Sequence, residues 1–334
     1  MQLTPEILMQ FAETTVDKLA RMDASVHAAY LRGSVVMPEN PLLGGTTDID
    51  LVFIHSWTPK VGREILRLTD DVHLDIVHHS QSDYQQGREL RVDPWMGPAL
   101  NNAKPLYDPQ HFIDFIQATV RGQFYRPDHV LARARNLAEQ SRQQWLELSQ
   151  LEAADQAGQM RAYLQAVANA ANAIALLSGE PLPERRILLE FPGRAQSIGR
   201  PGLSAGLLGL LGGPCLPVAE LETWLARWQA SMGELPDQER PLDLHPYRYK
   251  YYRSAFEAML ASGQPLALLW PLLHTWTLAV VLLPAHAVGR QDWQAFVRQL
   301  EMWGSAFPER VAALDAFLDQ VDEILLEWER RYGG

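Results

Sequence analysis

Cysteine is almost absent from this sequence: its 334 residues include one, Cys215. A single thiol excludes an internal disulfide and any zinc site built from several cysteines. The first residues also lack a basic segment followed by an apolar stretch, so the sequence does not predict a signal peptide. We therefore expect a cytoplasmic location.

Positive charge is also scarce. Lysine and arginine number 29 against 40 aspartates and glutamates, which gives a net charge of −11 and a pI near 5.4. Proteins that bind nucleic acid usually carry a basic patch or stripe, because neutralising phosphates supplies much of their affinity. The sequence shows no such stripe, so we expect no nucleic-acid partner. A small-molecule partner is therefore more plausible. That partner can be cationic, because an acidic cleft attracts cations.

Long hydrophobic runs are limited to one segment. Residues 266–284 contain no charged side chain and approach the ~20 apolar residues that span a bilayer. Pro271, His274 and two threonines interrupt the segment, and no clear basic flank accompanies it. A fully buried central helix has the same composition. We favour that interpretation and expect no membrane association.

The first third of the chain alternates between strand and helix patterns. A helix is expected to start at Thr4, with Pro5 at its first position. Strands are expected at residues 26–31, 48–55 and 72–78, and a brief strand or turn at 104–107. Helices are expected at residues 59–70, 83–91 and 94–101. This order predicts a small mixed sheet with helices against one side.

Beyond residue 122 no strand pattern remains. Periodic segments typical of helices cover residues 128–150, 158–177, 218–233, 247–262, 264–283, 291–304 and 308–332. The glycine-rich residues 191–217 indicate close helix packing or a mobile loop. The predicted fold class is α+β: a small mixed-sheet domain over residues 1–122, followed by a larger all-α helical bundle domain over residues 123–334.

Residues 31–54 are the most informative part of the sequence. A predicted strand ends in Gly33-Ser34, and the next strand opens with Asp48 and Asp50. Successive side chains on a strand point to opposite faces, so these aspartates share a face, roughly 6.6 Å apart along the chain. Two such carboxylates repel each other unless a cation lies between them. Because Mg²⁺ binds one or two carboxylates together with phosphate oxygens, the pattern predicts a magnesium site.

Two further features point toward a nucleotide. A Gly-Ser turn that enters a helix suits phosphate, because free backbone N–H groups and the positive helix end converge there. Asp75 projects from the middle of the third predicted strand. If this strand pairs beside that of Asp48 and Asp50, the three carboxylates can hold two metal ions about 3.5–4 Å apart. Asp75 can instead act as general base toward an incoming hydroxyl, and the sequence does not choose between these roles.

These residues resemble the signature of the nucleotidyltransferases of the DNA polymerase beta superfamily. The signature appears as Arg-Gly-Ser at 32–34 and Asp-Ile-Asp-Leu at 48–51, and the third acid of the family falls on Asp75. The likeness covers roughly the first third of the chain and is closest to the small-molecule branch, the aminoglycoside adenylyltransferases. Similar stretches follow the third acid at residues 87–90, 94–95 and 104–108. Many members carry a basic residue and a glycine where this chain has Met37-Pro38-Glu39-Asn40.

The resemblance implies a Mg²⁺-dependent enzyme that transfers a nucleoside monophosphate, AMP from ATP, to a hydroxyl of a small-molecule acceptor and releases pyrophosphate. It implies that Gly33 and Ser34 bind the nucleotide phosphates, and that Asp48, Asp50 and Asp75 are catalytic and hold two metal ions. The helical part is expected to close over the nucleotide. Candidate acceptor contacts there are Trp145, Tyr163, Asn169, Asn172, His245, Tyr247, Tyr251 and His274.

Three other hypotheses remain open from the sequence. The same chemistry can modify a protein side chain, as in antitoxins that adenylylate a partner. The domain can also bind nucleotide without catalysis, or it can be a vestige attached to a helical scaffold. His73 and His79 share the predicted face of Asp75, with His78 between them, but phosphoryl transfer favours hard oxygen ligands over a transition-metal site.

Overall fold

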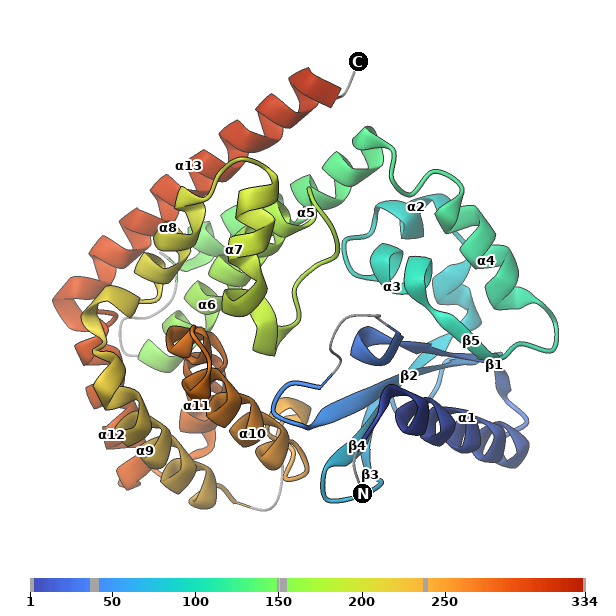
Figure 1. Ribbon diagram of the computed structural model, residues 1–334, viewed down its shortest axis with the longest axis horizontal. Helices are drawn as coiled ribbons and strands as arrows, with labels where there is room; N and C mark the ends of the chain where they lie inside the picture. Colours follow the sequence, from blue (N-terminus) through green and yellow to red (C-terminus); the bar gives the residue numbers. More distant parts are fainter. Residues whose placement is uncertain (1–2, 37–41, 149, 151–154, 237–239, 333–334) are drawn as a thin grey trace. The chain divides into compact units, whose positions relative to one another are not determined.

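The computed structural model describes residues 3–36, 42–148, 150, 155–236 and 240–332 (Figure 1). It divides into two compact units. The first comprises Met1–His129 and His245–Ala255, and the second comprises Val130–Leu244 and Phe256–Gly334. A small mixed sheet toward the amino terminus is followed by a helical region, as the α+β prediction states. The domain boundary at residues 122 and 123 stays a prediction.

The first unit contains a mixed sheet in the strand order β3-β4-β2-β1-β5. The strands are β1 (Val26–Arg32), β2 (Thr47–His55), β3 (Arg63–Arg67), β4 (Val72–Ser80) and β5 (Lys104–Tyr107). β2 and β4 are parallel, and the other neighbours are antiparallel. The helices are α1 (Pro5–Met22), α2 (Gly87–Val92), α3 (Met96–Asn102), α4 (Phe112–Arg121) and the first part of α10 (Arg248–Ala261), with short 3₁₀ helices η1 (Gly33–Val36) and η2 (Gln81–Tyr84).

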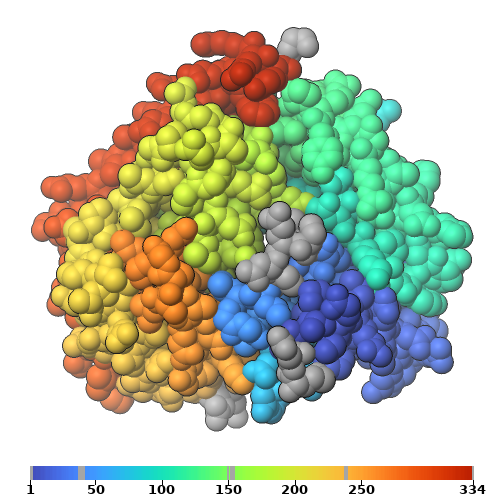
Figure 2. Space-filling model, in the orientation of Figure 1, coloured from blue at the N-terminus to red at the C-terminus, as the bar shows by residue number. Residues whose placement is uncertain are grey.

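One face of the sheet is covered by α1. Thr4 caps this helix by accepting a hydrogen bond from the Ile7 backbone N–H, and Pro5 follows, as predicted. Leu8, Ala12 and Val16 repeat every four residues, and they pack with the odd-numbered apolar residues of β2 into one core cluster. The charged residues of α1 are exposed, and part of this helix, in dark blue, lies on the face of the molecule that Figure 2 shows.

Helices also cover the opposite face, so the prediction of helices against one side is wrong. Val52 and Ile54 of β2 form a second core cluster with Leu100 of α3 and Ile113 and Ile116 of α4 (Figure 1). The even-numbered side of β2 therefore changes character along the strand. It carries aspartates at its start and buried aliphatic side chains at its end, and α3 and α4 cover the aliphatic part.

The helix predicted at residues 59–70 is also wrong, because the structure has strand β3 there. β3 pairs antiparallel with β4 and forms the edge of the sheet. The turn between them is held by Thr69, whose hydroxyl oxygen accepts hydrogen bonds from the backbone N–H groups of Asp71 and Val72. The other predicted strands are confirmed as β1, β2, β4 and β5, and the predicted short helices correspond to α2 and α3.

The described residues of the second unit form helices and no strand, as predicted. Its helices are α5 (Pro127–Leu148), which begins in the first unit, α6 (Gln156–Ala175), α7 (Ile187–Ser197), α8 (Gly202–Leu210), α9 (Leu221–Gly233), the end of α10, α11 (Leu269–Leu282), α12 (Val288–Gln299) and α13 (Phe307–Tyr332). Short 3₁₀ helices are η3 (Glu184–Arg186), η4 (Gly213–Cys215), η5 (Val218–Glu220), η6 (Leu242–Leu244), η7 (Pro265–Leu268) and η8 (Gly304–Ala306).

Two sequence alternatives in this unit are resolved. The glycine-rich stretch contains α7 and α8, and an added Cβ at Gly206 would lie 3.4 Å from the Phe317 ring, which is a close helix contact. Gly202 and Gly209 have no atom within 4 Å of an added Cβ, so close packing is seen at Gly206 but not at every glycine of the stretch. Among the described residues, Pro265–Leu282 is a stretch long and apolar enough to cross a membrane, but 67% of it is buried in the structure. This burial agrees with the core helix that we favoured.

Candidate metal centre

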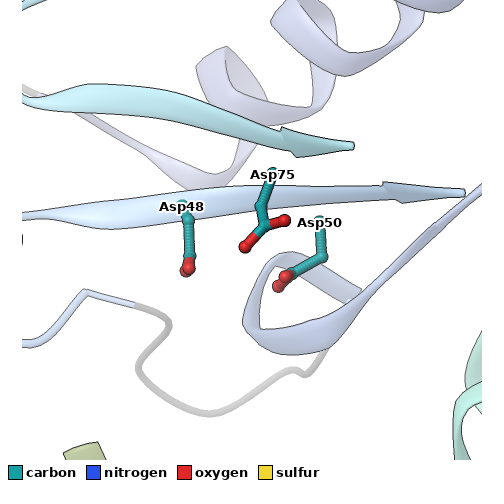
Figure 3. Close-up of side chains that lie close together, drawn as sticks. All are labelled: Asp48, Asp50 and Asp75. Atoms are coloured by element: carbon teal, nitrogen blue, oxygen red, sulfur yellow. The ribbon is translucent and has the colours of Figure 1, made fainter. Parts of the chain in front are cut away.

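The three aspartates of the sequence motif lie together. β2 and β4 are parallel neighbours, and their register places Asp50 directly beside Asp75. Asp48 precedes Asp50 on the same face, so all three carboxylates point into one space (Figure 3). One ligand atom from each lies within 4.8 Å of those from the other two. The predicted convergence of these side chains is therefore confirmed.

Burial and the neighbouring carboxylates of the cluster affect the pKa of Asp50. Asp48 and Asp75 are buried, and Asp50 is half-buried. Burial and the neighbouring charges of Asp48 and Asp75 raise the pKa of Asp50 to about 7, although Arg32 and Arg248 oppose the shift. Carboxylates this close need cations nearby to stay ionised together.

One such cation, Arg63, was missed by the sequence analysis because its strand was predicted as a helix. From β3, Arg63 binds both oxygens of Asp75, with Nε 2.7 Å from Oδ1 and Nη2 2.6 Å from Oδ2. Such a two-point contact fixes the orientation of a carboxylate. Burial would raise the pKa of Asp75, but the hydrogen bonds from Arg63 and the charges of Arg248 and Arg32 outweigh it and hold the pKa below its usual value.

The second cation is Arg248, the first residue of α10. Its Nη2 lies 2.6 Å from Oδ2 of Asp75 and 3.2 Å from Oδ2 of Asp48, and all three side chains are buried. Burial disfavours the charged guanidinium, yet Tyr252, Asp48, Tyr251 and Asp75 raise its pKa above the ordinary value. Arg248 therefore stays charged inside the cluster.

The contacts around Arg248 hold the start of α10 against the sheet. Lys250 pairs with Asp71 at 2.5 Å. The ring of Tyr251 meets that of His73 edge to face, with centroids 5.3 Å apart. The backbone also approaches closely, since an added Cβ at Gly44 would lie 2.0 Å from the Ser254 carbonyl oxygen. In the sequence, Arg248 lies 173 residues from Asp75 and 200 residues from Asp48. No local sequence pattern therefore points to Arg248.

The Gly-Ser turn has a structural role that the motif did not specify. Gly33 has φ +75°, and an added Cβ would lie 2.1 Å from Oδ2 of Asp50. Ser34 links the turn to β2, with its Oγ 3.0 Å from Oγ1 of Thr47. The described residues of the turn, Gly33–Val36, form the 3₁₀ helix η1. Phosphate binding by these two residues stays a prediction, and residues 37–40 lie outside the described part of the chain.

Replacing Gly33 by alanine is expected to destabilise the protein and displace Asp50. The left-handed backbone alone costs roughly 1–2 kcal/mol with a Cβ, and the contact with Asp50 adds to it. Gly45→Ala is the matched control, because Gly45 has φ +73° with no atom within 4 Å of an added Cβ. Urea denaturation should show the larger loss for Gly33→Ala. Equal losses in both variants would contradict a role of Gly33 in making room for Asp50.

The histidines near Asp75 do not assemble a second metal site. His79 Nδ1 lies 2.6 Å from the Tyr84 hydroxyl. His78 is on the other face of β4 and lies within hydrogen-bond distance of His55. His73 shares the face of Asp75, but its Nε2 is 4.0 Å from Asp48. Within the described residues, the three aspartates are the one group of three or more side chains suited to a metal ion.

Several predicted acceptor contacts have structural partners in the core of the second unit. Tyr163 donates a hydrogen bond to the Leu210 carbonyl oxygen, and Asn172 accepts one from the Leu182 backbone N–H. Trp145 donates a hydrogen bond to the Val311 carbonyl oxygen, and Asn169 donates one to the Gln144 side chain. His274 is hydrogen-bonded to Glu184. His245, Tyr247 and Tyr251 belong to the second segment of the first unit, near Arg248. Contact of any of these residues with an acceptor stays a prediction.

The chemistry of the cluster suits a hard divalent cation. All its donors are carboxylate oxygens, which bind Mg²⁺ or Mn²⁺ in preference to softer metals. Two adjacent parallel strands fix the spacing of these carboxylates.

No protein-family model matches the chain, and no curated protein matches it.

Proposed function

We propose that this protein is a Mg²⁺-dependent nucleotidyltransferase. It transfers AMP from ATP to a hydroxyl group of a small-molecule acceptor and releases pyrophosphate. The observation that carries this proposal is the meeting of Asp48, Asp50 and Asp75, from a motif spread over two strands, within 4.8 Å. The amino-terminal sheet is then the nucleotidyltransferase domain, and the helical region is the all-α domain that follows it.

Asp48 and Asp50 would hold the metal ion, which supplies positive charge to the phosphates and polarises the phosphorus that is attacked. Gly33 allows the carboxylate of Asp50 to approach the turn, since any side chain there would strike it. Arg32 of β1 lies directly opposite Asp50 of β2 in the sheet, so the two side chains are on the same face. From this position Arg32 is suited to bind the triphosphate. Fixed charges of this kind account for most of the catalysis in phosphoryl transfer.

For Asp75, the contacts favour a metal-binding and electrostatic role over that of general base. Both of its oxygens accept hydrogen bonds from arginines, and its pKa is lowered by them. An efficient general base needs a pKa near the working pH and an oxygen free to take the proton. The acceptor hydroxyl would then lose its proton to another group or to solvent.

The proposal is tested by incubating the purified protein with Mg²⁺ and α-labelled ATP against a panel of hydroxyl-bearing compounds, aminoglycosides included. We expect pyrophosphate release that needs Mg²⁺, stops with a chelator and rises with at least one compound. The label should appear on that compound. Label on a protein instead would identify a protein acceptor. Nucleotide binding without pyrophosphate release from any compound would contradict transfer.

A further inference from the structure

We propose that the aspartate cluster holds one divalent cation, and that the Arg248 guanidinium takes the position of a second one between Asp48 and Asp75. This inference rests on the proposed function, because it concerns the number of metal ions at the same site. It replaces the two-metal arrangement that the resemblance implies.

The first argument is the number of oxygen lone pairs left for metal. An ionised carboxylate offers about four acceptor positions, two on each oxygen. Oδ2 of Asp75 accepts from Nη2 of both Arg63 and Arg248, each at 2.6 Å, and Oδ1 accepts from Nε of Arg63 at 2.7 Å. Counted over the described part of the chain, one position on Oδ1 remains. Asp75 can therefore contribute to one metal ion, whereas Asp48 and Asp50 keep most of their positions.

The second argument is where the guanidinium lies. Nη2 of Arg248 bridges Oδ2 of Asp48 and Oδ2 of Asp75, so it occupies the space that a metal ion shared by these two carboxylates would need. A divalent cation placed there would meet a positive charge at contact distance. Carboxylate oxygens of Asp48 and Asp50 lie within 4.8 Å of each other, and we assign the metal ion to the space between them.

The third argument is that Arg248 is fixed in place. Its side chain is 7% exposed, and its guanidinium carbon lies 5.6 Å from the centre of the Tyr251 ring. The Lys250–Asp71 pair and the close approach of Gly44 to Ser254 hold the same helical turns. A guanidinium keeps its proton in proteins and donates hydrogen bonds in a fixed plane. Arg248 can therefore stabilise negatively charged oxygen atoms at this position without a second metal ion.

The test is to count bound Mn²⁺ by electron paramagnetic resonance in the purified full-length protein. Ions bound elsewhere on this acidic chain are subtracted by using the Asp48→Asn/Asp50→Asn double variant. We expect one ion for the wild-type cluster and two for Arg248→Met. Arg63→Met is the matched control. It removes an equal charge from Asp75 and frees two acceptor positions there, but it leaves the Arg248 guanidinium between Asp48 and Asp75, so it should still bind one ion.

Each outcome separates the two proposals. Two ions in the wild type would overturn the inference and leave the proposed function standing. One ion in both the wild type and a folded Arg248→Met variant, checked by circular dichroism, would also overturn the inference. No ion in the wild type would remove the proposed function together with it. If Arg248→Met does not fold, the wild-type count alone still distinguishes one ion from two.

Discussion

Replacing Asp48 or Asp50 by asparagine is expected to lower the rate of pyrophosphate release by roughly a hundredfold to a thousandfold, the loss typical of removing one preorganised electrostatic group from the transition state. Each substitution takes one negative oxygen from the metal ion while keeping the size of the side chain. Neither removes a buried aliphatic group, so the sheet should remain folded. The measurement is the initial rate with the acceptor found in the screen, at saturating Mg²⁺.

Asp17→Asn provides the control for this loss. Asp17 is exposed on α1, where it pairs with Arg21 and touches neither the sheet nor the cluster. Its substitution removes the same charge and should leave the rate unchanged. A folded Asp48→Asn or Asp50→Asn variant that kept the wild-type rate would end the proposal that these carboxylates hold the catalytic metal.

Replacing Asp75 by asparagine is expected to lower the free energy of unfolding by roughly 3 kcal/mol, because removing one partner of a buried ion pair strands the other charge. Asp75 is 2% exposed and accepts a hydrogen bond from Arg248, whose side chain is 7% exposed. The 3.2 Å contact of Arg248 with Asp48 is longer than the 2.6 Å contact with Asp75 that the substitution weakens. Urea denaturation at neutral pH without added metal measures the change.

The neighbouring pair of Lys250 and Asp71 gives a matched comparison. It joins the same helix to the same strand region, but both side chains are about half exposed. Asp71→Asn should therefore cost at most about 1 kcal/mol. Adding Arg248→Met to Asp75→Asn should recover part of the loss, since the stranded charge is then gone. A full loss that persists in the double variant would point to packing instead of charge.

The aspartate cluster could be predicted because its geometry follows from local rules. Alternation along a strand places Asp48 and Asp50 on one face. A single further assumption, that the strand of Asp75 lies beside theirs, brings in the third carboxylate, and the register of β2 and β4 bears this out. The long periodic helices after residue 122 were predictable for the same reason, since a helical period repeats over many residues.

The two arginines were not predictable, for different physical reasons. Arg63 lies in a short segment whose charged and apolar residues fit a helix as well as a strand, and its pairing with β4 decides the outcome. Arg248 lies in a predicted helix that was correctly found. Its position among the acids depends on contacts with residues 173 and 200 positions away, which no local pattern encodes.

The distance in sequence between Asp75 and Arg248 also bears on the order of synthesis. At roughly 5–20 residues per second, a ribosome makes the 173 residues that separate them in about 9–35 s. Throughout that interval the nascent sheet has its acids but lacks one of the two arginines that bind Asp75. A fragment cut after His129 would retain that incomplete condition permanently, so trimming the gene to its amino-terminal third would not reproduce the site.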